Sequence, residues 1–198
     1  GIELRKQLHL EPFEVDDRYN EGYKRTIGSG NFFLYDHWGS MNTDELLSHV
    51  RYMAQAQGVT HIVLDHISIV VSGMLESEMS ERKAIDVLMT RLRALVEESK
   101  LSLILVSHLK RPEGNRGYED GLAPNLSSLR GSASLSQLAD MVIALSRNLQ
   151  SAEDKHTTTV TVLKNRFSGE TGIATYLEYD TDQGVLNETA FKGDFSTS

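Results

Sequence analysis

The stretch His61-Ile62-Val63-Leu64-Asp65 decides the fold of this chain. Its first four positions are mostly apolar and β-branched, and the run ends on a carboxylate. Continuous runs of this kind are typical of a central strand in a parallel sheet, which is covered on both faces. The acid then lies at the carboxyl end of the strand, where open α/β sheets hold their ligands. In nucleotide-hydrolysing domains this position carries an Asp that binds Mg²⁺, usually through water, but apolar strands that end in Asp are also common in other α/β proteins.

Upstream of this run, the pattern predicts a strand followed by a helix. Residues 32–36 are aromatic and aliphatic and indicate the strand. The helix is expected to begin after Asn42, which forms a capping box with Glu45, and to end at Gly58. Its apolar positions recur with i, i+3, i+4 spacing. Strand, helix and strand with short joints predict a right-handed βαβ unit.

A second buried strand is predicted downstream. Residues 68–80 have no steady period and are expected to form a loop, and Ser80 is expected to cap the helix that follows. The run 101–107 then ends at His108. Because parallel strands end at the same edge of a sheet, Asp65 and His108 should lie together where a nucleotide phosphate would bind. A histidine at a strand end can also be structural, and the residues alone leave both interpretations open.

A long loop is predicted over residues 109–131. Four glycines, two prolines and four cationic residues lie in this range. Loops of this length in compact domains are usually functional or disordered. Basic residues between glycines can follow a phosphate backbone. On composition alone, a solvated surface loop is the slightly favoured interpretation.

The last third of the chain predicts a short helix and three strands, the last two antiparallel at one edge of the sheet. They cover residues 132–137, 140–145, 157–163 and 173–179, and the strand at 140–145 is expected to be buried. Lys164 and Arg166 follow the second strand and should face the same way, since residues two apart on a strand share a side. They are either an ordinary exposed pair or a phosphate clamp.

Composition limits the remaining possibilities. The chain has 198 residues, of which 39% are apolar and 24% charged, as in one ordinary globular domain. Its net charge of −8 argues against a generally basic nucleic-acid coat, so phosphate contacts must come from local clusters. Zero cysteines exclude disulfides and thiolate metal sites. No apolar stretch approaches the roughly 18–20 residues of a membrane span, and we expect no signal peptide, no membrane contact and a cytoplasmic protein.

Five motifs, taken together, resemble those of the DnaB-type, ring-forming replicative DNA helicases, which are RecA-like ATPases. They lie at residues 64–70, 107–110, 129–132, 144–148 and 164–172. The pattern is most similar to the helicase half of phage bifunctional primase–helicases, and the mitochondrial helicase Twinkle is a more distant relative. The similarity implies a RecA-like α/β fold. It consists of a mainly parallel sheet flanked by helices, with antiparallel strands at its C-terminal edge. The domain would span residues 31–183, between a poorly defined segment (1–30) and a tail (184–198).

The resemblance also implies roles for individual residues. Asp65 matches the acid that orders Mg²⁺ on the nucleotide phosphates, and His108 matches the γ-phosphate sensor that relays to the DNA loop. Arg166 matches the arginine finger that acts on the neighbouring subunit's nucleotide, with Lys164 beside it. The nucleotide base would be held by Arg147 and Tyr179, and single-stranded DNA by Lys110, Arg111, Asn115, Arg116, Arg130 and Gln137. The implied cofactors are ATP or dTTP with Mg²⁺, and the implied assembly is a homohexameric ring.

The sequence departs from the family pattern in three respects. The phosphate loop Gly-x-x-x-x-Gly-Lys-Ser/Thr is absent from the chain, and the family's catalytic glutamate falls upstream of its first residue. A further family cation is replaced by Ser136. We therefore expect a fragment of an NTP-dependent helicase that moves on single-stranded DNA and unwinds duplex DNA, inactive as this chain alone. Two alternatives stay open: a fragment of a RecA- or KaiC-like ATPase, and a non-catalytic DNA-binding or assembly module.

Overall fold

A computed structural model describes residues 17–35, 43–72, 80–114, 116–130, 133–152, 154–182 and 184–190. The chain divides into two compact units, residues 1–39 and 40–198. Each unit is described by itself. The predicted domain limits, 31 and 183, stay a prediction.

The first unit contains helix α2 (Asp17–Arg25) and a short 3₁₀ helix, η1 (Ile27–Ser29). The strand predicted at residues 32–36 is wrong for its described part, because residues 32–35 have no strand conformation. Their aromatic and aliphatic side chains favour a strand, but a strand also needs a partner for its backbone. No described strand pairs with this segment.

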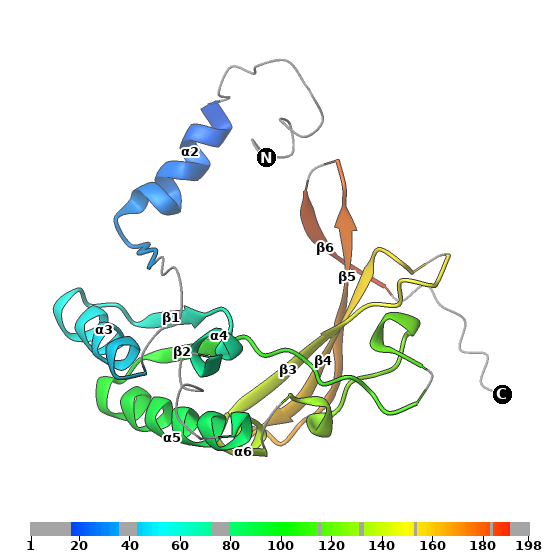
Figure 1. Ribbon diagram of the computed structural model, residues 1–198. Coiled ribbons are helices and arrows are strands. Elements are labelled where there is room, and N and C mark those ends of the chain that lie inside the picture. Colours follow the sequence, from blue (N-terminus) through cyan, green and yellow to red (C-terminus); the bar gives the residue numbers. More distant parts are fainter. Residues whose placement is uncertain are drawn as a thin grey trace. The chain divides into compact units, whose positions relative to one another are not determined.

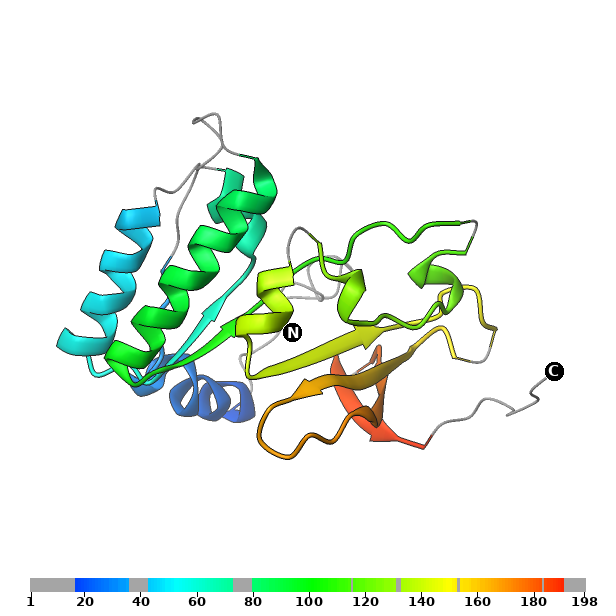
Figure 2. The same cartoon turned by 90° about the horizontal axis from the view of Figure 1, so that it is seen from below.

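The second unit begins with two parallel strands and two long helices (Figure 1). Strand β1 (His61–Leu64) pairs in parallel with β2 (Ser102–Leu105), with Ile62 opposite Leu103. Helices α3 (Thr43–Ala56) and α5 (Glu81–Ser99) lie side by side on one face of these strands, as Figure 2 shows from below. The predicted strand–helix–strand unit over residues 32–65 is wrong, because residues 32–35 form no strand. A different strand–helix–strand crossover joins β1 to β2, with α5 as its main helix.

The core lies between these helices and one face of the two strands. Leu88 and Leu92 of α5 are fully buried, and Leu46 and Val50 of α3 pack in the same cluster. Ile62, Leu64, Leu103 and Leu105 of the strands pack against it. The other face differs from the prediction that both would be covered, because Val63 is 64% exposed and Ile104 is 57% exposed. An apolar run specifies a strand, but the layer that covers each face comes from other elements.

A short helix replaces the first part of the loop predicted at residues 68–80. Helix α4 (Ile67–Ser72) buries Ile67, Val70 and Val71, which are spaced i, i+3, i+4. A single helical turn carries too few positions for its period to stand out in the sequence. Ser80 caps α5 as predicted, and its Oγ accepts a hydrogen bond from the Lys83 backbone N–H at 3.4 Å. The predicted cap at Asn42 lies outside the described residues.

The C-terminal part forms a second, antiparallel sheet in the order β3-β4-β5-β6. Its strands are β3 (Met141–Ser146), β4 (Thr157–Asn165), β5 (Gly172–Asp180) and β6 (Val185–Thr189). Helix α6 (Ala133–Leu138) precedes β3 and confirms the predicted short helix. Strand β3 is not buried as predicted, because Ile143 is 55% exposed and Leu145 is 64% exposed. The range 184–198, predicted as a tail, contains β6. The predicted α/β fold, with parallel strands followed by antiparallel ones, is confirmed.

Candidate nucleotide and DNA site

Asp65 and His108 lie at the same edge of the β1–β2 sheet. Asp65 follows the last residue of β1, and His108 comes three residues after β2, whose direction is the same. Their proximity is supported by His66, whose ring centroid is 4.3 Å from that of His108 at an interplanar angle of 69°. Asp65 and His108 are both exposed. The predicted placement of Asp65 and His108 at the same carboxyl edge of the two strands is therefore confirmed, and their roles stay a prediction.

His66 was missed as a site residue by the sequence analysis. Its Nδ1 atom is buried and has no hydrogen-bond partner among the described residues. Its edge-to-face contact with His108 depends on the path of the backbone after β1, which the sequence pattern does not specify. His66 therefore supports one side of the His108 ring.

The loop at residues 109–131 is closed at its base. Leu109 forms an isolated antiparallel bridge with Leu129. On either side of it, the Lys110 N–H donates to the Ser128 carbonyl at 2.9 Å, and the Arg130 N–H donates to the His108 carbonyl at 3.1 Å. Two 3₁₀ turns, η2 (Tyr118–Asp120) and η3 (Leu126–Ser128), give the interior of the loop local order. The loop is thus tied by its own backbone directly to His108.

The cationic side chains of this loop differ in whether they already have a hydrogen-bond or ion-pair partner. Lys110 and Arg111 are exposed, and neither has an ion-pair partner among the described residues. The Arg116 Nε donates to the Asp120 carbonyl at 3.1 Å, and Arg130 pairs with Glu81 of α5 at 3.3 Å. Gln137 is exposed on α6, and Asn115 lies outside the described residues. Lys110 and Arg111 are therefore the loop cations most available to a phosphate.

Lys164 is engaged by the end of helix α6. Its Nζ donates to the carbonyls of Ser136, Gln137 and Ala139 at 2.8, 3.1 and 2.7 Å. These include carbonyls that a helix leaves without an internal partner at its C-terminus. The geometry therefore gives Lys164 a structural role as a cap. Its predicted catalytic role stays a prediction.

Arg166 lies just after β4 and is paired with Asp140. The Arg166 Nη1 lies 3.0 Å from the Asp140 Oδ1, and Arg93 of α5 approaches the other carboxylate oxygen at 2.6 Å. Hydrogen bonds from Arg93 and then from Arg166 hold the pKa of Asp140 below its ordinary value. Lys164 and Arg166 thus face the same segment, residues 136–140, as their spacing predicted.

Arg147 and Tyr179 lie at the opposite end of β4 from Arg166. Arg147 follows β3, whose last residue, Ser146, pairs with Thr159 near the start of β4. The Tyr179 N–H donates to the carbonyl of His156, just before β4, at 3.1 Å. Both side chains are exposed. The sheet brings them to one end, and the predicted base sandwich stays a prediction.

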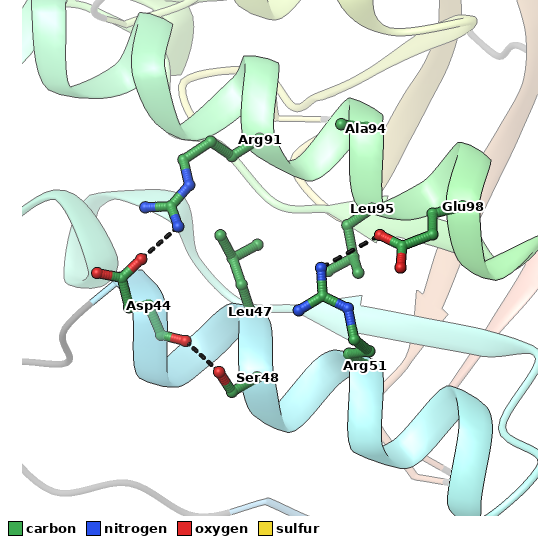
Figure 3. A pocket seen from close by; sticks show the side chains of 8 residues that line it. All are labelled: Asp44, Leu47, Ser48, Arg51, Arg91, Ala94, Leu95 and Glu98. Atoms are coloured by element: carbon green, nitrogen blue, oxygen red, sulfur yellow. Dashed lines mark hydrogen bonds and ion pairs between the residues drawn. The ribbon is translucent and has the colours of Figure 1, made fainter.

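A surface groove between α3 and α5 is not part of this site (Figure 3). It has a volume of about 300 Å³ and a floor that includes Leu47 and Leu95. Ion pairs bridge it from Arg51 to Glu98, at 3.2 Å, and from Arg91 to Asp44. Because its cations are already paired and none of the predicted site residues lines it, we interpret the groove as a helix–helix contact.

Comparison with known proteins matches most of the chain to one family. The model of the DnaB-like helicase C terminal domain matches residues 12–183. The DNA helicase/primase of Enterobacteria phage T3 is 43% identical over 193 residues, which cover 97% of this chain and 34% of that protein. A probable plasmid replicative DNA helicase of Chlamydia psittaci is 26% identical over 117 residues, or 59% of this chain and 24% of that protein. The solved structure of a DnaB-like replicative helicase, described with its interactions with primase, has a TM-score of 0.67 and 20% identity over 89% of this chain and 42% of that chain.

The chain has a parallel strand pair that ends in an acid and a histidine, followed by a closed basic loop and an antiparallel sheet. This arrangement has the RecA-like fold of a DnaB-like helicase. The chain belongs to the DnaB-like helicase C terminal domain family. It spans about a third of the length of the phage T3 protein that it resembles. None of the helices in the described ranges is both long and apolar enough to cross a membrane.

Proposed function

We propose that this chain acts as part of an NTP-driven replicative DNA helicase that moves on single-stranded DNA and unwinds duplex DNA. The observation that carries the proposal is the hydrogen bond of 3.1 Å from the Arg130 N–H to the His108 carbonyl. It joins the edge where a nucleotide phosphate would lie to the base of the basic loop. A protein that converts nucleotide turnover into motion on DNA needs such a physical link between its two sites.

Asp65 and His108 are the proposed phosphate contacts of this chain. Among the described residues no group of three or more His, Cys, Asp or Glu side chains could hold a metal as a closed cage. Asp65 is exposed at the strand end, and a single carboxylate fits Mg²⁺, which usually takes one or two carboxylates, several waters and the substrate phosphates. When bound, Mg²⁺ would neutralise charge on the β- and γ-phosphates. The proposed substrate is ATP or dTTP.

The positions of Arg166 and of the Arg147–Tyr179 pair support a nucleotide site shared between two copies. They lie at opposite ends of β4, whose nine residues span about 30 Å at roughly 3.3 Å per residue. One nucleotide cannot reach both ends. If each nucleotide lies between two copies, the base contacts of one copy and Arg166 of its neighbour can act on the same molecule. This requires a head-to-tail interface, which forms a ring when its rotation closes, and we propose a homohexamer in the cytoplasm.

The basic loop is the proposed contact to single-stranded DNA. We expect the purified chain alone to hydrolyse no NTP above background, because its sequence has no phosphate loop. DNA binding is therefore tested in the complete gene product that contains these residues. Fluorescent oligothymidine is titrated at several salt concentrations against the parent and a Lys110→Ala/Arg111→Ala variant. Each phosphate contact that is lost should reduce the slope of the logarithm of the binding constant against the logarithm of the salt concentration by about 0.7 in magnitude. The double variant should therefore lose about 1.4 for each copy that contacts the strand.

A matched control removes two lysines outside the loop. Lys83 and Lys155 are exposed, and the Lys83→Ala/Lys155→Ala variant has the same net charge as the test variant. It should keep the parent's slope. If the two double variants have equal slopes and affinities, the loop is not the DNA contact. A parent that binds DNA but has no DNA-stimulated NTP hydrolysis would support the alternative of a binding module.

A further inference from the structure

Asp140 contacts Arg166 through both its main chain and its side chain. The Arg166 N–H donates to the Asp140 carbonyl at 2.9 Å. The Arg166 guanidinium lies 3.0 Å from the Asp140 carboxylate, as its Nη1–Oδ1 distance shows. The Arg166 side chain is 57% exposed, so much of the guanidinium faces outward while one edge is held. Asp140 thus fixes the base of Arg166 and limits the directions in which its side chain can point.

Asp140 is itself held by helix α5. The Arg93 Nη1 donates to the Asp140 Oδ2 at 2.6 Å, and the Arg93 Nε donates to Glu97 one turn away at 2.8 Å. The side chains of Arg93 and Asp140 are only 29% and 34% exposed. A carboxylate between two guanidinium groups stays ionised, and hydrogen bonds to Arg93 and Arg166 hold its pKa below the ordinary range. A series of ion pairs therefore connects helix α5 to the end of β4, through Glu97, Arg93, Asp140 and Arg166.

The turn that follows Arg166 is also fixed. The Asn165 Oδ1 accepts hydrogen bonds from the N–H groups of Phe167 and Ser168 at 3.0 and 3.3 Å. The Gly169 N–H donates to the Asn165 carbonyl at 2.9 Å, and Gly169 has a φ of +77°, which favours glycine. With its backbone set by this turn, Arg166 retains only its side-chain rotamers, and Asp140 selects among them.

We propose that Asp140 is a positioning residue, which orients Arg166 towards the nucleotide of a neighbouring copy and anchors it to α5 through Arg93. This inference rests on the proposed function, in which Arg166 supplies charge as the γ-phosphate leaves. Such an arginine is worth about 10³–10⁵ in rate in related systems. A misplacement of about 1 Å can cost roughly 10². Loss of Asp140 should therefore slow turnover by about 10- to 100-fold, less than loss of Arg166.

A plain surface ion pair is the alternative explanation, and exposed pairs often contribute little. The two explanations differ in what the loss of Asp140 does once Arg166 is gone. A positioning residue acts through Arg166, so its loss should then have no further effect. A purely structural residue should have the same effect in both backgrounds.

The test is a double-mutant cycle in the complete gene product. DNA-stimulated release of radiolabelled γ-phosphate, which keeps low rates measurable, is compared for the parent, Asp140→Asn, Arg166→Ala and the double variant. Glu98→Gln is the matched control, since Glu98 lies on the same helix but pairs with Arg51 and not with Arg93, and its rate should stay within about twofold of the parent. Thermal unfolding of each variant checks that it is folded. In the 198-residue chain, carboxyl NMR follows the titration of Asp140, whose midpoint should rise when Arg166 is replaced by alanine.

The expected result is a 10- to 100-fold loss for Asp140→Asn, a loss of about 10³ or more for Arg166→Ala, and no further loss in the double variant. An Asp140→Asn protein with the parent's rate, beside an inactive Arg166→Ala protein, would overturn the inference and leave the proposed function intact. Equal losses from Asp140→Asn in both backgrounds would also overturn it. An Arg166→Ala protein with the parent's rate would refute the arginine finger itself, and the inference with it. An unchanged Asp140 titration in Arg166→Ala would show that the contact does not form.

Discussion

Replacing Lys164 by methionine is expected to destabilise the second unit by removing the cap of helix α6. The Lys164 Nζ donates to three backbone carbonyls, of Ser136, Gln137 and Ala139, at 2.7–3.1 Å. Two of these bonds, to Ser136 and Ala139, are partly buried. Methionine keeps most of the apolar stem but provides no donor, so the carbonyls lose their partner.

The size of the effect follows from these contacts. A hydrogen bond that involves a charged group contributes about 1.5–3 kcal/mol, and a cation at a helix C-terminus contributes about 0.3–1 kcal/mol. All three bonds share one ammonium group that water would otherwise solvate, so their contributions do not add. We expect a net loss of about 2–3 kcal/mol in the free energy of unfolding, which corresponds to a melting temperature lower by roughly 5–10 °C in a domain of this size.

Thermal and urea unfolding of the purified chain, followed by circular dichroism, measure this loss. Lys155→Met is the matched control, because Lys155 is exposed and the chemical change is the same. Its free energy of unfolding should stay within about 0.5 kcal/mol of the parent. The reasoning is refuted if Lys164→Met is as stable as Lys155→Met, since Lys164 would then be a free surface cation.

Three further perturbations test other parts of the structure. Leu88→Ala removes a fully buried side chain of α5, and should lower the free energy of unfolding in urea by about 2–5 kcal/mol. The pKa of Asp140 is lower in the folded chain, so its stabilisation is present above the unfolded pKa of about 3.9 and is lost as the pH falls through the folded pKa. The stability difference between the parent and Asp140→Asn should therefore be flat near pH 6 and shrink below about pH 4, and a difference that grows in acid would contradict this. Val63→Thr/Ile104→Thr replaces two exposed apolar side chains of the strands. It should reduce binding of the dye ANS with little loss of stability, whereas a large loss would mean that this face is covered.

The sequence predicted most of the helices and strands, because their apolar patterns extend over enough residues to be recognised. Helix α5 has a repeating apolar face, on which Ala84, Ile85, Leu88, Leu92 and Leu95 are buried. Helix α4 was missed because its three buried residues form one turn. The strand predicted at residues 32–36 failed since side-chain preference does not supply a backbone partner. For the same reason the runs of β1 and β3 predicted strands correctly but did not reveal that one face of each is exposed.

The sequence predicted which residues lie at the strand ends of the candidate site, but it did not predict which side chains contact one another there. Asp65 and His108 follow neighbouring parallel strands, so fold topology alone brings them together. The partner of Arg166 lies 26 residues away in the sequence, and that of Arg93 lies 47 residues away. A lone aspartate before a strand carries no pattern that would have singled out Asp140. Only the three-dimensional contacts of Arg93, on α5, and of Arg166, just after β4, show that one carboxylate serves both arginines.

In the proposed function, two nucleotide contacts act on one basic loop, and the structure connects both of them to that loop. At its base, the loop is bonded through Arg130 to the carbonyl of His108, which lies at the proposed phosphate edge. Beyond the loop, helix α6 is held at its end by Lys164, two residues before Arg166 on the same chain segment. The loop is thus attached to His108, which would sense one nucleotide. Helix α6 is attached to the end of β4, next to Arg166, which would contact the nucleotide of the neighbouring copy. Loss of either attachment should uncouple the motion of the loop from the nucleotide contacts. Amide hydrogen exchange at residues 110–130 should therefore be faster in Lys164→Met than in the parent, even where the DNA contacts are intact. Unchanged exchange there would show that α6 does not transmit the position of β4 to the loop.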